Sequence, residues 1–264
     1  APLHPDSAGV LTVIALIRAV APALGHCELS YLGRSEIDVP RAQAQHAAYA
    51  AALSSLGCEL KWLAALPAQP DGVFVEDTAV VVPEVAVSTR PGVASRRGEV
   101  ESTAAALADH LPLQHIREPA TLEGGDVLRI GRNLYVGASR RSNAQGVRQL
   151  AQALAPFGYS VRAVAMRDCL HLKSAATFIA PDILLVNPAW VDPGKFGCAR
   201  VIAVAADEPY GANTLSVGGV TLVSADYPKT RQLLEKAGVA TRTLDVSELH
   251  KAEAALTCLS VLLQ

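Results

Sequence analysis

Length and composition allow one large domain or two ordinary ones and exclude several classes of protein. The chain has 264 residues, of which 50% are hydrophobic and 18% are charged. This composition excludes a disordered chain and supplies a sizeable core. Because 23 Lys and Arg residues are balanced by 25 Asp and Glu residues, no overall positive field is available for binding nucleic acid. Only 5% of the residues are aromatic, which also disfavours base-stacking surfaces.

The cysteines and the apolar segments indicate a cytoplasmic protein. Five cysteines are spread along the chain without a CxxC pair, which argues against a disulfide framework and a structural zinc site. The apolar stretch 10–24 is interrupted by Arg18, and no basic segment precedes it. We therefore expect neither a signal peptide nor a membrane span, and we predict a soluble cytoplasmic protein with reduced thiols.

The sequence contains a recurring break pattern. Five times a helical stretch ends at a break and a short β-rich run follows, with the breaks at Gly57, Leu111, Gly158, Gly197 and Gly238. The breaks are spaced 39 to 54 residues apart, a range that indicates structural repetition such as the units of a propeller. Ordinary α/β chains also contain helix–Gly–strand joints, so this pattern alone does not fix the fold.

The elements between the breaks are predicted in chain order. A helix is expected over 39–56 after the cap Asp38, a second from the cap Ser142 to about residue 157, and a third from Pro228 to about residue 237. Short apolar runs at 128–130, 134–136, 183–186 and 220–223 predict strands. The repeating unit is therefore strand, strand, helix, strand. GxGxxG, the phosphate-loop lysine motif and GxSxG are absent, so nucleotide binding and a serine-hydrolase site have no support.

Several polar residues lie in apolar surroundings, and each has a purely structural explanation. Cys258 and His171 lie in apolar runs, where a buried core thiol or a core imidazole is the more common outcome. Glu123 precedes two glycines, which a tight turn alone would explain. Glu76 and Asp77 interrupt an apolar β-like run, where they are either solvated or paired with a cation. Together these types offer a nucleophile, a proton shuttle and a carboxylate cradle that fits a guanidinium.

Six segments, taken in this order, resemble the dimethylarginine dimethylaminohydrolases of the amidinotransferase and arginine deiminase superfamily. They are FVEDTAVV, STRPGVASRRGEV, ATLEGGDVL, SNAQG, LHLKSA and LTCLSVLL, and the resemblance extends from about Gln45 to the C-terminus. The resemblance implies a five-bladed αβ-propeller of pseudo-fivefold units, the pentein fold, as a single catalytic domain over 1–264. It also implies a guanidino amino acid as substrate, no cofactor and no metal, no nucleic-acid or membrane partner, and it permits a homo-oligomer.

The resemblance assigns roles residue by residue. Cys258 resembles the nucleophile and His171 the general acid and base. Glu123 resembles the third catalytic residue, which holds the guanidinium and orients the histidine. The residues that resemble the substrate-binding set are Asp77 with Glu76 beside it for the guanidinium, Asp71 as a further acid, Arg96 and Arg141 for the α-carboxylate, and Leu24 in a lid. The chain departs from the family before the cysteine, where Glu253 and Ala254 occupy the places of an Asp-Gly pair.

The implied reaction is hydrolysis of an Nω-methylated arginine to citrulline and methylamine or dimethylamine. The Cys258 thiolate would attack the guanidinium carbon to form a covalent thiouronium, and neighbouring acids would keep the free thiol protonated. Arginine, agmatine or citrulline are competing substrates, although the two arginines favour one with a carboxylate. A non-catalytic binding protein on the same scaffold also remains compatible with the sequence, and a papain-like protease is a more remote possibility.

Overall fold

The structure is a computed structural model that describes residues 12–198 and 200–263. The ends of the predicted domain 1–264 and the beginning of the stretch 10–24 lie outside these residues. Within the described part of the chain, no helix combines the length and apolar character that a membrane crossing requires. The five cysteines, all in the described ranges, are free.

The fold is α/β and contains five three-stranded sheets. In every sheet the first strand of the unit is antiparallel to the second, and the second is parallel to the third. The strands of the five sheets are β15 (Val261–Leu263), β1 (Ile14–Arg18) and β2 (Glu59–Leu63); β3 (Ala79–Val82), β4 (Val85–Ser88) and β5 (Leu113–His115); β6 (Val127–Ile130), β7 (Asn133–Gly137) and β8 (Ser160–Val164); β9 (Ala176–Ile179), β10 (Ile183–Val186) and β11 (Arg200–Ala203); and β12 (Leu215–Val217), β13 (Val220–Ser224) and β14 (Thr241–Leu244).

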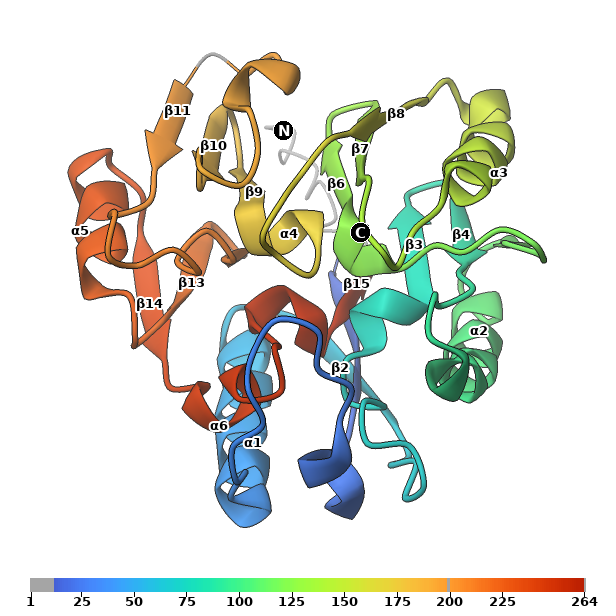
Figure 1. Cartoon of the computed structure of the whole chain (residues 1–264), viewed down its shortest axis with the longest axis horizontal. Coiled ribbons are helices and arrows are strands. Elements are labelled where there is room, and N and C mark those ends of the chain that lie inside the picture. Colours follow the sequence, from blue (N-terminus) through green and yellow to red (C-terminus); the bar gives the residue numbers. More distant parts are fainter. Residues whose placement is uncertain (1–11, 199, 264) are drawn as a thin grey trace, which may run out of the picture.

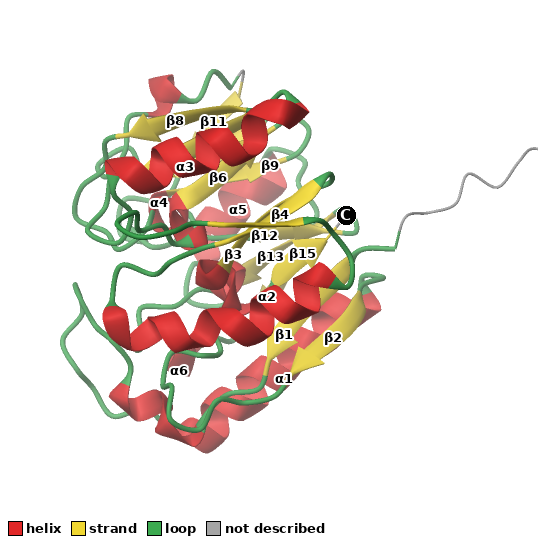
Figure 2. Ribbon diagram, turned by 90° about the vertical axis from the view of Figure 1, so that its right-hand side faces the viewer, coloured by secondary structure: helices red, strands yellow, loops and turns green. Residues whose placement is uncertain are grey.

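A helix joins the second and third strands in four of the five units. These helices are α1 (Val39–Ser55), α2 (Val100–Ala108), α3 (Ala144–Leu154) and α5 (Pro228–Lys236), and they lie on the outside of the ring of sheets in Figure 1. Figure 2 shows α2 and α3 covering one side of the molecule. In the described part of the unit with β10 and β11, the connection has only the short 3-10 turn Pro193–Lys195.

The predicted breaks fall at one equivalent position of the repeat. Each break lies two or three residues before the third strand of its unit. Gly57, Gly158, Gly197 and Gly238 have φ between 62° and 91°, a left-handed conformation that glycine adopts without steric cost. The five-unit arrangement is therefore consistent with the repetition that the sequence indicated.

The helix predictions are confirmed in position, with one wrong cap. Asp38 caps α1 by accepting a hydrogen bond from Arg41 N. The cap of α3 is Asn143, whose side chain accepts from Gly146 N at 2.8 Å, instead of Ser142. Ser142 is unsuited to the cap because its hydroxyl donates to Asp126 Oδ2 at 2.7 Å and accepts from Glu123 N at 3.1 Å.

The apolar core is divided among the units. Leu150 and Leu154 of α3 pack with Leu134 and Val136 of β7 in one cluster, while Tyr49 of α1 belongs to a separate one. Each helix thus buries its apolar face against its own sheet or a neighbouring one. Polar side chains from the turns between units can then gather in the interior.

Candidate active site

The candidate residues come from equivalent turns of the repeat. Four units begin with a short helical turn that leads into the first strand, either directly or after one intervening residue. The turns are η2 (Val75–Thr78), η4 (Gly124–Asp126), α4 (Leu172–Ala175) and η7 (Leu256–Leu259). Turn η2 packs against both η4 and η7, and α4 packs against η4. Asp77 and Cys258 lie within such turns, while Glu123 and His171 are the residues before them. Repetition of the fold therefore brings distant residues into one site.

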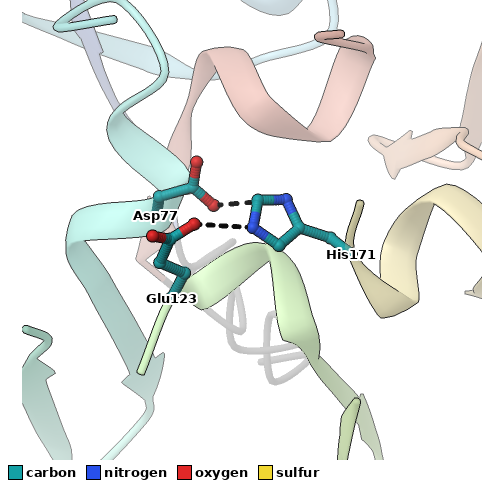
Figure 3. A group of neighbouring side chains, drawn as sticks. All are labelled: Asp77, Glu123 and His171. Atoms are coloured by element: carbon teal, nitrogen blue, oxygen red, sulfur yellow. Dashed lines mark hydrogen bonds and ion pairs between the residues drawn. The ribbon is translucent and has the colours of Figure 1, made fainter. Parts of the chain in front are cut away.

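His171 is held between two buried carboxylates (Figure 3). Its Nε2 lies 2.7 Å from Glu123 Oε2, and its Nδ1 lies 3.8 Å from Asp77 Oδ1. All three side chains are at most 5% exposed. Burial opposes a charged imidazole, but Asp77, Glu123 and Asp126 outweigh it and raise the pKa of His171 to about 9. The imidazolium form therefore prevails at neutral pH.

The two glycines after Glu123 are required by close packing. A Cβ at Gly124 would lie 2.0 Å from the carbonyl oxygen of Glu76, and one at Gly125 would lie 2.7 Å from His171 Nδ1. Gly125 also donates its N–H to Asp77 Oδ1 at 3.0 Å. The tight turn expected from this sequence is thus present, and the same turn also forms part of the site.

Asp77 remains a carboxylate. Burial would raise its pKa, but His171 and Arg96 outweigh this effect and lower the pKa to about 2. Arg96 Nη1 donates to Asp77 Oδ2 at 2.7 Å. The negative charge next to His171 is therefore present throughout the physiological pH range.

Cys258 lies in η7, the short turn within the apolar run that the sequence shows. Its Sγ accepts a hydrogen bond from Ala255 N at 3.4 Å. Burial, followed by Glu76 and Asp77, raises the pKa of the Cys258 thiol far above its usual range. The free site therefore holds a neutral thiol, as expected from the surrounding acids.

One small cavity unites most of the predicted residues. Cys258, His171, Asp77 and Asp71 line a cavity of about 20 Å³ together with both predicted arginines. This volume holds about one water molecule. An amino acid substrate therefore requires movement of the surrounding loops.

The two predicted arginines differ in how they are engaged. Arg96 is 3% exposed, and besides Asp77 it donates Nη2 to Glu99 Oε2 at 2.8 Å. Arg141 makes longer contacts, 3.4 Å from Nη1 to Glu123 and 3.2 Å from Nη2 to Ser30 Oγ. Arg141 is thus held by longer contacts than Arg96, and its guanidinium is the more available of the two for a ligand.

Asp71 and Leu24 are placed beside the first loop of the chain. Asp71 is buried and accepts a hydrogen bond from Glu28 N at 3.0 Å. Leu24 lies in the 3-10 turn Pro22–His26, its side chain is fully buried in an apolar cluster, and its carbonyl oxygen accepts from Cys27 N at 3.1 Å. Leu24 does not line the cavity.

Glu76 faces a different cavity from its neighbour Asp77. Its Oε1 lies 2.5 Å from Lys173 Nζ, and its Oε2 accepts from Thr257 Oγ1 at 2.7 Å. All three residues line a separate cavity of about 230 Å³. Glu76 therefore lies beneath the site, and the structure does not place it with Asp77 around one ligand.

Sequence reasoning assigned no role to three further residues near the site. Asp126 is fully buried, and its Oδ1 accepts from Leu172 N at 3.1 Å, which fixes the start of α4 next to His171. Glu99 anchors Arg96. Lys173 pairs with Glu76. The only sequence signal for these residues is a charged group inside an apolar segment, which applies to Asp126 and Lys173 but not to Glu99.

The three side chains of Figure 3 also carry metal-ligand atoms. One atom from each of Asp77, Glu123 and His171 lies within 4.8 Å of the others. However, Asp77 already accepts from Gly125 and Arg96, and His171 binds metal only after losing its proton. The donor set therefore suits an imidazolium between carboxylates better than a resident cation.

Comparisons with known proteins agree with this geometry. A family model described as arginine deiminase matches residues 112–208. The N(G),N(G)-dimethylarginine dimethylaminohydrolase of Streptomyces coelicolor is 39% identical over 253 residues, which cover 95% of this chain and 96% of that relative.

Two solved structures extend the comparison. One is a cysteine-to-serine variant of dimethylarginine dimethylaminohydrolase from Pseudomonas aeruginosa complexed with citrulline, with a TM-score of 0.90, 31% identity, and coverage of 94% of this chain and 98% of that one. The other is a histidine-to-glycine variant as an adduct with S-methyl-L-thiocitrulline, with a TM-score of 0.89, 31% identity and the same coverage of 94% and 98%. The chain belongs to the dimethylarginine dimethylaminohydrolase family.

Proposed function

We propose that this protein hydrolyses Nω-methylated arginines to citrulline and methylamine or dimethylamine. The observation that carries this proposal is the single cavity lined by Cys258, His171 and Asp77. A thiol, an imidazolium and a carboxylate are the groups needed to attack a guanidinium carbon, protonate its amine and hold its positive charge. Family membership supports the same activity.

Binding uses the charges of the cavity. The guanidinium pairs with Asp77, and the α-amino group pairs with Asp71, which is buried at the edge of the first loop. Arg141 binds the α-carboxylate, and Arg96 assists it. To do so, Arg96 must replace one of its hydrogen bonds to Asp77 or Glu99 with a hydrogen bond to the substrate. Glu76 contributes through the local negative charge, since it lines the other cavity.

The first half of the reaction forms a bond to sulfur. The substrate cation lowers the pKa of the Cys258 thiol because its positive charge offsets the negative charge of the acids, and the thiol releases its proton to solvent as the thiolate forms. The thiolate attacks the guanidinium carbon, and His171 donates its proton to the departing methylated nitrogen. The carbon–nitrogen bond breaks, dimethylamine leaves, and a thiouronium remains on sulfur.

The second half uses water. Neutral His171 takes one proton from water as its oxygen attacks the same carbon. The carbon–sulfur bond then breaks, the thiolate takes the remaining proton, and citrulline leaves. Glu123 acts by holding His171 through the 2.7 Å contact to Nε2, so that the imidazole faces the reacting atoms in both halves.

The fold supports a finer proposal, in which the five units form an αβ-propeller around a pseudo-fivefold axis. Five sheets with identical strand pairing support it, and so do the equivalent turns that carry the site. The single catalytic domain, the cytoplasmic location and any self-association stay predictions of the sequence.

The test is citrulline release from dimethylarginine, monomethylarginine, arginine and agmatine in parallel, with Cys258→Ser as the blank. We expect turnover of the two methylated substrates and none in the blank. Turnover of arginine or agmatine instead would preserve the thiol chemistry and refute the substrate. Wild-type turnover by Cys258→Ser would refute the nucleophile.

A further inference from the structure

A third cavity, of about 330 Å³, lies at the edge of the β3–β4–β5 sheet and shares no lining residue with the active-site cavity. Strands β4 and β5 are parallel, and Ser88 pairs in register with His115, so their carboxyl ends meet at this edge. Residues just beyond those ends, including Arg90 and Arg117, line the cavity, and Arg97 lines it from the turn before α2.

The walls of this basic pocket carry an excess of positive charge. Three arginines and one histidine line it, although the whole chain has a formal net charge of −2. Arg90 pairs with Glu118 at 3.3 Å, and Glu118 is 80% exposed. Over residues 12–198 and 200–263, neither Arg97 nor Arg117 has an acidic side chain within ion-pair distance. Gathering like charges in a cavity costs free energy, which an anion between them recovers.

The pocket adjoins the active site through residues 90–92. Arg97 Nε donates to the carbonyl oxygen of Pro91 at 3.3 Å. The next residue, Gly92, donates its N–H to Glu123 Oε1 at 3.0 Å, and a Cβ there would lie 2.6 Å from the carbonyl oxygen of Arg141. Pro91 and Gly92 therefore connect Arg97 by direct contacts to Glu123, which holds His171, and to Arg141.

We propose that this pocket binds a small phosphate-bearing anion and that its occupancy changes catalysis through Pro91 and Gly92. Phosphate oxygens match the planar fork of arginine and accept several charge-assisted hydrogen bonds at once. The volume admits a phosphate or a phosphorylated small molecule. The binding site stands on its own geometry, whereas the effect on catalysis rests on the proposed function.

Calorimetric titration tests the site without using turnover. Inorganic phosphate, pyrophosphate and ribose 5-phosphate are titrated at constant ionic strength into the wild type and Arg97→Ala/Arg117→Ala. The control is Arg162→Ala/Arg200→Ala, which removes two exposed arginines from β8 and β11, outside the lining of the pocket. We expect saturable binding that weakens at least ten-fold in the pocket variant and is unchanged in the control. Absence of saturable binding by all three anions, or an equal loss in both variants, would overturn the site. The anion that binds most tightly shows whether the pocket prefers free phosphate or a phosphate ester.

Steady-state rates test the coupling. We expect the best anion to change kcat/KM for dimethylarginine at least three-fold in the wild type and to have no effect in Arg97→Ala/Arg117→Ala. Reciprocal linkage requires citrulline to change the anion's affinity if the anion changes the affinity for citrulline. Anion binding with unaltered rates would refute the coupling. Because the titration does not depend on turnover, failure of the proposed activity remains distinguishable from failure of the pocket.

Discussion

At the scale of single residues, the charge of His171 depends on the carboxylates around it, of which Glu123 is hydrogen-bonded to the ring. Glu123→Gln keeps a hydrogen-bond acceptor beside Nε2 but removes one negative charge. We expect the pKa of His171 to fall from about 9 by about one unit or more, because a nearby charge shifts a buried group by about 1–3 units. An NMR titration of the imidazole measures this change.

The matched control for this titration is Glu84→Gln, which removes a carboxylate paired with Arg132 and Tyr159 away from the site. It should leave the His171 titration unchanged. A His171 pKa that is the same in wild type and Glu123→Gln would contradict the electrostatic role assigned to Glu123.

Cys258 should react preferentially with cationic reagents. Its thiol is neutral in the free site because burial and the acids raise its pKa. An amidinium reagent such as 2-chloroacetamidine brings its own positive charge to Asp77, whereas 2-chloroacetamide does not. We expect alkylation of Cys258 at pH 7.5 to be at least ten-fold faster with the amidine, as measured by mass spectrometry. Asp77→Asn should remove most of this preference, and equal rates in the wild type would refute activation by the cation.

The sequence predicted which residues have reactive or charged groups at the site better than it predicted the partners that these residues contact. Adjacent acids looked equivalent in the sequence, yet η2 directs Asp77 toward His171 and Glu76 toward Lys173. Likewise, Arg96 is committed to Asp77 and Glu99. Which side of a short turn a residue faces depends on tertiary packing, and spacing along the chain does not encode it.

At the scale of elements, the loop 28–35 is fastened over the active site by Glu253. The Glu253 carboxylate accepts from Ser30 N at 2.9 Å and also from the next two amides, those of Tyr31 and Leu32. Glu253 has φ of 57°, so its backbone is in the left-handed region. Glu253, one of the two residues that depart from the family pattern, therefore binds three consecutive amides of this loop.

Glu253→Gln should loosen the loop. Charge-assisted hydrogen bonds contribute roughly 1.5–3 kcal/mol, and partial exposure reduces this, so we expect a loss of about 1.4 kcal/mol, a ten-fold change. Hydrogen exchange at residues 30–32 should speed up about ten-fold, and KM for dimethylarginine should rise more than kcat falls. Glu36→Gln removes an exposed charge nearby and serves as the control. Unchanged exchange in Glu253→Gln would show that other contacts hold the loop.

The elements themselves were predictable where local signals are strong. Proline and Asp38 fixed the beginning of α1, and glycines in left-handed conformations marked the ends of four helical connections. The failure at Ser142 has a physical cause, because its hydroxyl satisfies Asp126 and the Glu123 amide. Those partners lie 16 and 19 residues away in the chain, beyond the reach of local capping rules.

At the scale of the whole molecule, repetition explains why the site could be inferred. Each unit contributes one turn to the interior, so a polar residue ahead of each first strand was a visible signal. The same logic places Asn213, shortly before β12, against η7, where its Nδ2 donates to Thr257 Oγ1 at 3.0 Å. The sizes of the cavities and the position of the loop 28–35 depend on how the units pack against one another. No single segment of the sequence specifies them.

The buried ion cluster should make global stability depend on pH in a defined direction. The pKa of His171 is about 9 in the fold against an ordinary value of 6.5, so its imidazolium stabilises the fold fully below pH 6.5. This contribution disappears as pH rises through about 9, and its size is ~3 kcal/mol. The free energy of unfolding of wild type and His171→Gln, measured by urea denaturation from pH 6 to 9.5, should therefore differ most at pH 6, and the difference should shrink toward pH 9.5. The exposed His110→Gln should show no such trend. A constant difference between wild type and His171→Gln would mean that His171 keeps its ordinary pKa in the fold, and would contradict the imidazolium that the mechanism uses as general acid.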